Sequence, residues 1–196
     1  MSILYPKIRL AWLPSMLRYA ALGALLAGFY GILHDQVTYS ISPEYFTRFK
    51  FSQFHYADFG LPPRAFVAEI GFLATWWVGF FAAWFIARIT VPKFPPARRC
   101  RYTMQGILMV FVSALVSSTV GYELGMLHGP DYSRWDAVAS SLGIVDQPAF
   151  VRVAYMHNAG YLGGLLGLLA AVVYVRAAKT PNPPASVQAS VLTNDT

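Results

Sequence analysis

Four long stretches of mostly apolar residues alternate with shorter polar segments along this chain. Each stretch holds about 20 residues or more, which lets a helix cross a hydrocarbon core about 30 Å thick. Each also contains glycine, which is more frequent in membrane helices than in soluble ones. The pattern predicts an all-α integral membrane protein with four transmembrane helices in an antiparallel bundle, over about 14–34, 64–90, 102–127 and 150–175.

The composition agrees with a membrane protein, and the charge distribution orients it. Hydrophobic residues make up 56% of the chain, charged residues make up 12%, and the mean hydropathy is positive, which is unusual for a soluble domain. Basic residues gather before the first span, in the 91–101 connection and after the fourth span. By the positive-inside rule, both termini and this connection are cytoplasmic. We therefore expect a bacterial cytoplasmic membrane protein whose loops 35–63 and 128–149 face the periplasm.

The rest of the composition limits the domain organisation and the partners. One domain is expected over 1–179, and the proline-rich, small polar residues of 180–196 predict a disordered cytoplasmic tail. A cleaved signal peptide is the competing interpretation of the first span, but Arg18 and the lack of a small-x-small site argue against it. The lone Cys100 excludes an internal disulfide and a cysteine-rich metal site. The net charge of +6 comes largely from the cytoplasmic basic residues, so we expect a lipid bilayer as partner and no nucleic acid.

The two outer loops contain signals for short interfacial helices. Ser42, Pro43 and Glu44 predict a helix over about 43–50, with Ser42 as N-cap and Pro43 at the first helical position. Aromatic and charged side chains then alternate through 45–59, which is typical either of an anchor in the headgroup region or of a lid. In the second outer loop, a helical turn around Trp135 precedes Asp146, where the fourth span is expected to start.

Four ionisable residues from four different spans are predicted to lie at one membrane depth. A rise of 1.5 Å per residue from the cytoplasmic arginines places His34, Glu69, Glu123 and His157 about 24–33 Å along their helices. These four form one polar layer near the outer surface. Asp35 and Arg152 lie at its rim, and His128 caps the third span just beyond it.

Helical periodicity then predicts which of these side chains point into the bundle. His34 shares a helical stripe with Gly31, and His157 shares one with Gly160 and Gly164. Because small residues mark close approach of membrane helices, both histidines are predicted to face inward. The direction of the two glutamates stays open.

Two imidazoles and two carboxylates are ligands that iron, copper, manganese or zinc accept. The leading hypothesis is a membrane-embedded metal- or cofactor-binding protein with a redox role, and its ligands are His34, Glu69, Glu123 and His157. In this hypothesis Asp35, His128 and Arg152 support the ligands. A b-type haem between His34 and His157 is the second cofactor hypothesis, since glycines beside both histidines would admit a porphyrin.

Two other functional classes stay open. The polar layer would fix helix packing in a non-catalytic accessory or assembly subunit, whose glycine and alanine ridges dock against other membrane subunits. It would serve as a proton or ion site in a small transporter. Common hydrolase, phosphate-binding and dinucleotide-binding motifs are absent from the sequence, so no catalytic residue is assigned and enzymatic activity stays undecided.

Overall fold

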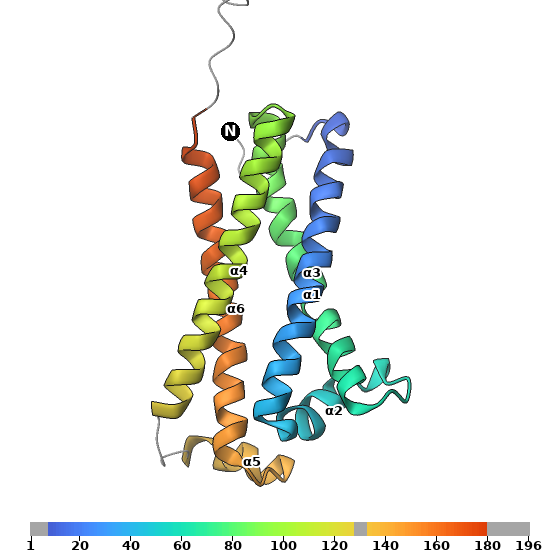
Figure 1. Ribbon diagram of the computed structural model, residues 1–196, viewed down its shortest axis with the longest axis vertical. Helices are drawn as coiled ribbons and strands as arrows, with labels where there is room; N and C mark the ends of the chain where they lie inside the picture. Colours follow the sequence, from blue (N-terminus) through green and yellow to red (C-terminus); the bar gives the residue numbers. More distant parts are fainter. Residues whose placement is uncertain (1–7, 128–132, 180–196) are drawn as a thin grey trace, which may run out of the picture.

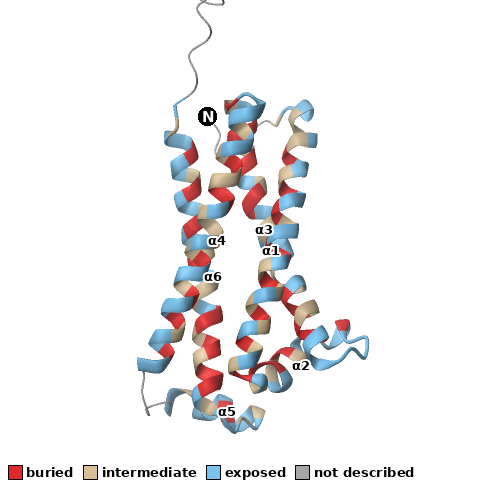
Figure 2. Ribbon diagram, in the orientation of Figure 1, coloured by how far each residue is buried: buried red, intermediate tan, exposed pale blue. Residues whose placement is uncertain are grey.

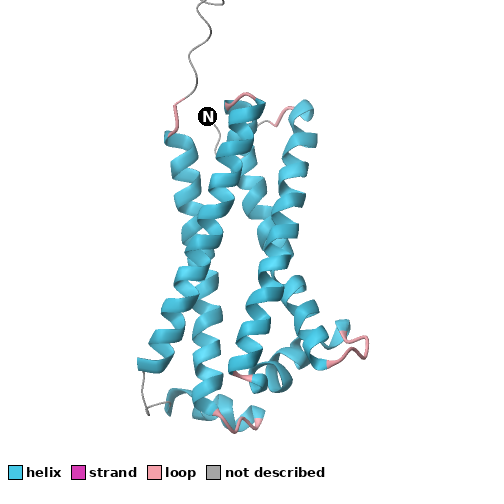
Figure 3. Ribbon diagram, in the orientation of Figure 1, coloured by secondary structure: helices cyan, strands magenta, loops and turns pink. Residues whose placement is uncertain are grey.

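The computed structural model describes residues 8–127 and 133–179, and it contains no β-strand within these ranges. Four long helices dominate it (Figures 1 and 3): α1 (Leu13–Ile41), α3 (Pro63–Lys93), α4 (Pro96–Leu127) and α6 (Gln147–Ala177). Each of the four is long and apolar enough to cross a membrane. The prediction of an all-α protein with four membrane-spanning helices is confirmed to this extent.

Short helices lie in the connections. Near the start of the chain is η1 (Leu10–Trp12), and the first long connection holds η2 (Tyr45–Lys50), α2 (Phe51–Gln53) and η3 (His55–Ala57). The other long connection holds η4 (Ser133–Trp135) and α5 (Asp136–Leu142). In Figure 1, α2 and α5 lie at one end, while the start of α1, the α3–α4 connection and the end of α6 lie at the other.

Two of the helices extend beyond the predicted spans. α1 continues past position 34 to Ile41, because Asp35 and Thr38 are buried within the structure. The Thr38 hydroxyl donates to the His34 carbonyl at 3.1 Å, so this buried hydroxyl has a hydrogen-bond partner within the helix. α4 begins at Pro96 and not near 102, because proline suits the first turn of a helix. The prediction started the span later because the arginines after Pro96 lower the local hydropathy.

The long helices form two tight pairs. α1 packs along α3 and α4 packs along α6, whereas α1 and α6 touch over a few residues. A Cβ on Gly31 would collide with the Gly71 carbonyl, so the backbones of α1 and α3 are in direct contact there. The Thr75 hydroxyl donates to the Ala27 carbonyl at 2.7 Å across the same interface. The predicted small-residue ridges therefore hold the first pair together.

In the second pair, α6 packs on α4 through a face other than the predicted stripe of Gly164. A Cβ on Gly163 would collide with the Ser117 side chain, and one on Gly167 would lie 2.8 Å from Val110 Cα. Gly164 has no heavy atom within 4 Å of such a position. Because neighbouring helical residues point about 100° apart, the contact with α4 runs through Gly163 and Gly167. The stripe of Gly164 does not face it.

Large apolar side chains cover the outside of the long helices. Figure 2 shows buried residues on the facing sides of the paired helices and exposed residues on their outer sides. On α1 the exposed side chains include Leu25, Phe29, Leu33 and Val37. A soluble protein would bury such a row of side chains, so these surfaces suit a lipid bilayer.

Candidate metal centre

The polar side chains of α1 and α6 meet where the two helix pairs approach each other. His34 and Asp35 come from α1 and His157 comes from α6, and one possible ligand atom from each lies within 4.8 Å of the others. His157 Nε2 is 3.9 Å from Asp35 Oδ1. The imidazole rings of His34 and His157 are 4.9 Å apart between centroids and nearly perpendicular. These three residues are the candidate metal centre.

Burial makes this cluster unusual. Asp35 and His157 are each 4% exposed, and His34 is half-buried. His157 Nε2 is buried, and no atom in the described part of the chain forms a hydrogen bond with it. A buried polar nitrogen without a partner is costly. A metal ion between the imidazoles and the carboxylate would supply the missing partner.

The position of His157 explains how two consecutive residues of one helix both reach the cluster. Side chains of His34 and Asp35 leave α1 about 100° apart, so they cannot approach each other along the helix. A residue on a facing helix can lie between them. His157 occupies this position, with its ring against His34 and its Nε2 toward Asp35. Asp35 is therefore part of the cluster itself, whereas the sequence placed it at the rim.

Two tyrosines cover the outer faces of the imidazoles. Tyr30 stacks on His34 with 5.6 Å between centroids and 17° between planes, and Tyr45 stacks on His157 at 4.8 Å and 19°. Tyr45 belongs to η2, and the ring of Phe46 in the same segment lies 6.2 Å from the His157 ring between centroids. Burial raises the pKa of the Tyr45 phenol above its usual value, with smaller contributions from Tyr161 and Asp35, so this hydroxyl stays neutral.

Lys50 brings a cation to the same region. Its side chain is 7% exposed, and its Nζ lies 5.7–5.9 Å from the ring centroids of Tyr45, Phe49 and Phe54. Burial lowers the pKa of this ammonium group, while the negative charge of Asp35 raises it. Lys50 therefore lies close enough to Asp35 to interact with it electrostatically.

The helix type of η2 explains why the sequence did not reveal Tyr45 and Lys50. In an α-helix, residues five apart point in different directions. η2 is a π-helix, in which hydrogen bonds join residues five apart and place them on one face. Tyr45 and Lys50 are therefore both buried against the bundle. The start of this segment agrees with its prediction, since Ser42 Oγ accepts a hydrogen bond from Tyr45 N at 3.4 Å.

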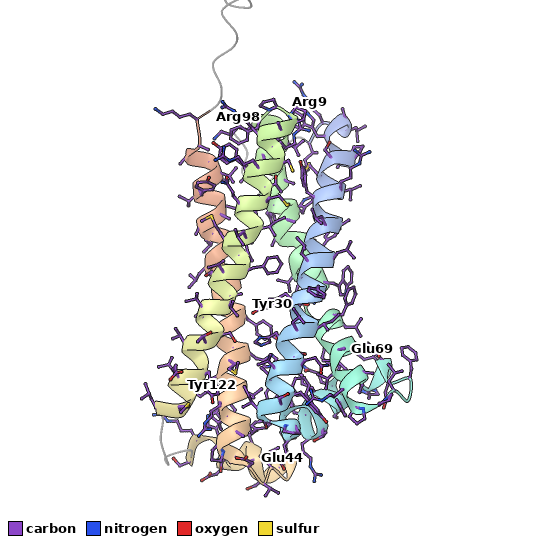
Figure 4. The ribbon with its side chains drawn as sticks, in the orientation of Figure 1. Arg9, Tyr30, Glu44, Glu69, Arg98 and Tyr122 are labelled. Atoms are coloured by element: carbon purple, nitrogen blue, oxygen red, sulfur yellow. The ribbon has the colours of Figure 1, made fainter. Side chains whose placement is uncertain are left out.

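A carboxylate fastens this segment to the helix that carries His157. Glu44 accepts hydrogen bonds from the backbone nitrogens of Val145 at 3.1 Å and Asp146 at 2.8 Å. Asp146 in turn caps α6, because its side chain accepts from Ala149 N at 3.1 Å. We call these contacts of Glu44 the clasp. The clasp connects the two outer segments, and Glu44 lies at the lower end of the molecule in Figure 4.

The other residues predicted for the site lie elsewhere. Figure 4 shows Glu69 on the outer flank of α3, apart from Tyr30, which points between the helix pairs. Glu69 is half-buried and Glu123 is exposed on α4, and neither belongs to the group of His34, Asp35 and His157. Of the supporting residues, Arg152 is half-buried on α6. His128 lies outside the described residues.

The contact between the imidazoles bears on the choice of cofactor. A haem with two axial histidines needs the porphyrin plane between the two rings. His34 and His157 instead touch edge to face, which leaves no room for a porphyrin between them. The arrangement favours a single metal ion over a haem.

Comparisons with family models, with curated proteins and with solved structures find no match for this chain. Its function is therefore inferred from the chemistry of its own residues. The group of His34, Asp35 and His157 is the feature that offers the most specific chemistry, since it combines buried ligand atoms from two helices with an unpartnered imidazole nitrogen.

Proposed function

We propose that this protein is a membrane-embedded metal-binding protein whose ligands are His34, Asp35 and His157. The buried, unpartnered Nε2 of His157, 3.9 Å from the Asp35 carboxylate, carries the proposal. Ligand atoms on one ion at bond lengths of 2.0–2.2 Å lie roughly 3–3.5 Å apart. The present separations are within 4.8 Å. Small side-chain rotations would therefore bring the three atoms onto one ion.

The donor set indicates which metals to test. Two imidazoles and one carboxylate form the set used by non-haem iron(II) proteins, and zinc, manganese and copper accept the same ligands. Three protein ligands leave at least one coordination position for another molecule. An iron site of this kind would support redox chemistry, which is the role that we propose first.

We place the site on the periplasmic side of a bacterial cytoplasmic membrane, with both termini cytoplasmic and the four helices antiparallel. The charge distribution supports this orientation. In Figure 4, Arg9 and Arg98 lie at the end of the molecule opposite Glu44. By the positive-inside rule, the end that carries the arginines is cytoplasmic.

Metal analysis of the purified full chain in detergent tests the proposal. After incubation with iron(II), zinc, manganese or copper and removal of excess metal, we expect about one ion per chain. The variants His157→Ala and Asp35→Asn should lose at least about 90% of it, because each removes one of three ligands. His55→Ala is the matched control, since His55 is exposed on η3. Wild-type protein that retains none of the four metals would overturn the proposal, as would full retention in both ligand variants.

A structural role is the second candidate, and the position of the cluster favours it. α1 and α6 touch over few residues, so the contacts among His34, Asp35 and His157 would fix one helix pair against the other in an accessory subunit. In that case chelators would leave the thermal stability of the protein unchanged. A metal site predicts a lower melting temperature after chelation.

A further inference from the structure

Lys50 is a buried cation whose charge needs a partner once a metal is present. Its side chain is 7% exposed, and it forms no ion pair within the residues that the structure describes. Its ammonium group lies among three aromatic rings. Asp35 is the carboxylate that raises the pKa of Lys50, and Asp35 is also the carboxylate of the candidate metal centre.

A metal ion bound to Asp35 would offset the negative charge that stabilises the Lys50 ammonium group. The charge of a divalent ion exceeds that of the single carboxylate that binds it, so the loaded centre carries a net positive charge. Lys50 would then face a second cation in a region of low dielectric constant, where like charges repel strongly. Tyr45 and Glu44 do not supply this negative charge to Lys50, because the Tyr45 phenol is neutral and the Glu44 carboxylate already accepts hydrogen bonds from the amides of Val145 and Asp146.

The coordination chemistry offers the missing negative charge. Three protein ligands leave an open position on the metal, and a monovalent anion in that position would lower the net positive charge of the metal, Asp35 and Lys50 by one unit and weaken the repulsion between the metal and Lys50. One stack of rings connects Lys50 with the candidate metal centre: Tyr45 lies flat on His157 with 4.8 Å between centroids, and Lys50 Nζ lies 5.9 Å from the Tyr45 centroid.

We propose that the metal and Lys50 together bind a small monovalent anion, of the carboxylate class, at the open coordination position. The proposal rests on the metal site proposed above. It predicts that the natural ligand or substrate of the centre carries a carboxylate or a similar single negative charge. If Lys50 interacts with the aromatic rings alone, replacing it would not change the affinity of the centre for anions.

Spectroscopic titration tests this assignment. The full chain in detergent is loaded with cobalt(II), whose absorption bands report ligand exchange, and titrated with sodium azide and then with sodium acetate. Lys50→Met removes the charge at similar volume, and Arg48→Met is the matched control, because Arg48 is an exposed cation of the same segment. We expect the Kd for both anions to rise about tenfold or more in Lys50→Met, the effect of one lost charged contact. Arg48→Met should stay within about twofold of wild type, a change of a few tenths of a kcal/mol.

The outcomes separate this inference from the proposed function. If wild type binds neither cobalt(II) nor any of the four metals tested above, the metal site fails and the anion site with it. If Lys50→Met binds cobalt(II) and its azide affinity equals that of wild type, the anion site is wrong while the metal site stands. Should Lys50→Met fail to fold, Lys50→Gln provides the uncharged side chain and Lys50→Arg the charged one. Equal azide affinity in Gln and Arg variants would equally overturn the inference.

Discussion

The imidazole of His157 lies flat against the phenol ring of Tyr45, with 4.8 Å between their centroids and 19° between their planes. This stack joins a residue deep in α6 to a short segment outside the long helices. It also makes Tyr45 part of one apolar cluster with Phe46, Val67 and Phe150. The outer segment therefore covers the candidate metal centre and shares its packing.

Replacing Tyr45 tests this packing. Tyr45→Ala should lower the free energy of unfolding by about 3 kcal/mol, because a large buried ring is removed. Tyr45→Phe keeps the ring and should stay within about 1 kcal/mol of wild type. The measurement is thermal or denaturant unfolding in detergent, followed by circular dichroism. Equal stability of wild type and Tyr45→Ala would show that the stack contributes nothing.

The helix pairs provide a sharper packing test. Gly31→Leu places a side chain against the Gly71 backbone and should destabilise the protein by about 3 kcal/mol or more. Gly164→Leu is the matched control, since no heavy atom lies within 4 Å of its Cβ position. The yield of monodisperse protein in size-exclusion chromatography measures the effect of each substitution. Similar yields for the two variants would contradict the packing of α1 on α3.

The clasp predicts a local change in dynamics. Glu44→Ala removes a charged acceptor from the amides of Val145 and Asp146, and loss of such a bond corresponds to about a tenfold increase in amide exchange. Hydrogen exchange measured by mass spectrometry over residues 143–149 should show this increase. Thr47→Ala, an exposed residue of the same segment, should leave exchange unchanged. Protection that survives Glu44→Ala would mean that other contacts hold this loop.

Lys50 predicts a pH dependence of stability in the metal-free protein. Burial lowers the pKa of the Lys50 ammonium group in the folded state below its usual value. Between the folded and unfolded pKa values the unfolded chain binds more protons, so the contribution of Lys50 to stability increases as pH rises through this interval. Unfolding measured from pH 7 to 10.5 should show this increase in wild type relative to Lys50→Met. Parallel curves for the two proteins would mean that Lys50 titrates normally.

The sequence predicted the depth of the polar residues better than their direction. Depth follows from counting residues along a helix, because the rise per residue is fixed. This brought His34 and His157 to one level, where the structure has them in contact. Direction depends on which ridge of each helix packs, and α6 packs through Gly163 and Gly167. Periodicity alone could not choose the packed ridge of α6, and it could not decide the direction of Glu69 on α3 or Glu123 on α4, so both glutamates stayed candidate ligands.

Periodicity could not predict the positions of two other residues, one in the candidate centre and one outside it, for another reason. Asp35 was predicted as a supporting residue at the rim, because adjacent residues of one helix diverge, and its place in the cluster depends on His157 of α6, which lies between it and His34. Lys50 is buried through a π-helical turn, and no periodicity of 3.6 predicts that face. Both depend on contacts between segments far apart in the chain, so no local pattern contains them.

The division of the molecule into two helix pairs has a consequence for biosynthesis. His34 and Asp35 belong to the first pair to be translated, whereas His157 belongs to the last helix. A ribosome-bound chain that lacks α6 holds two of the three ligands, and its metal affinity would be correspondingly weak. If the proposed centre binds a metal, loading would therefore follow insertion of the last helix, and metal occupancy would report that α6 has been inserted and paired.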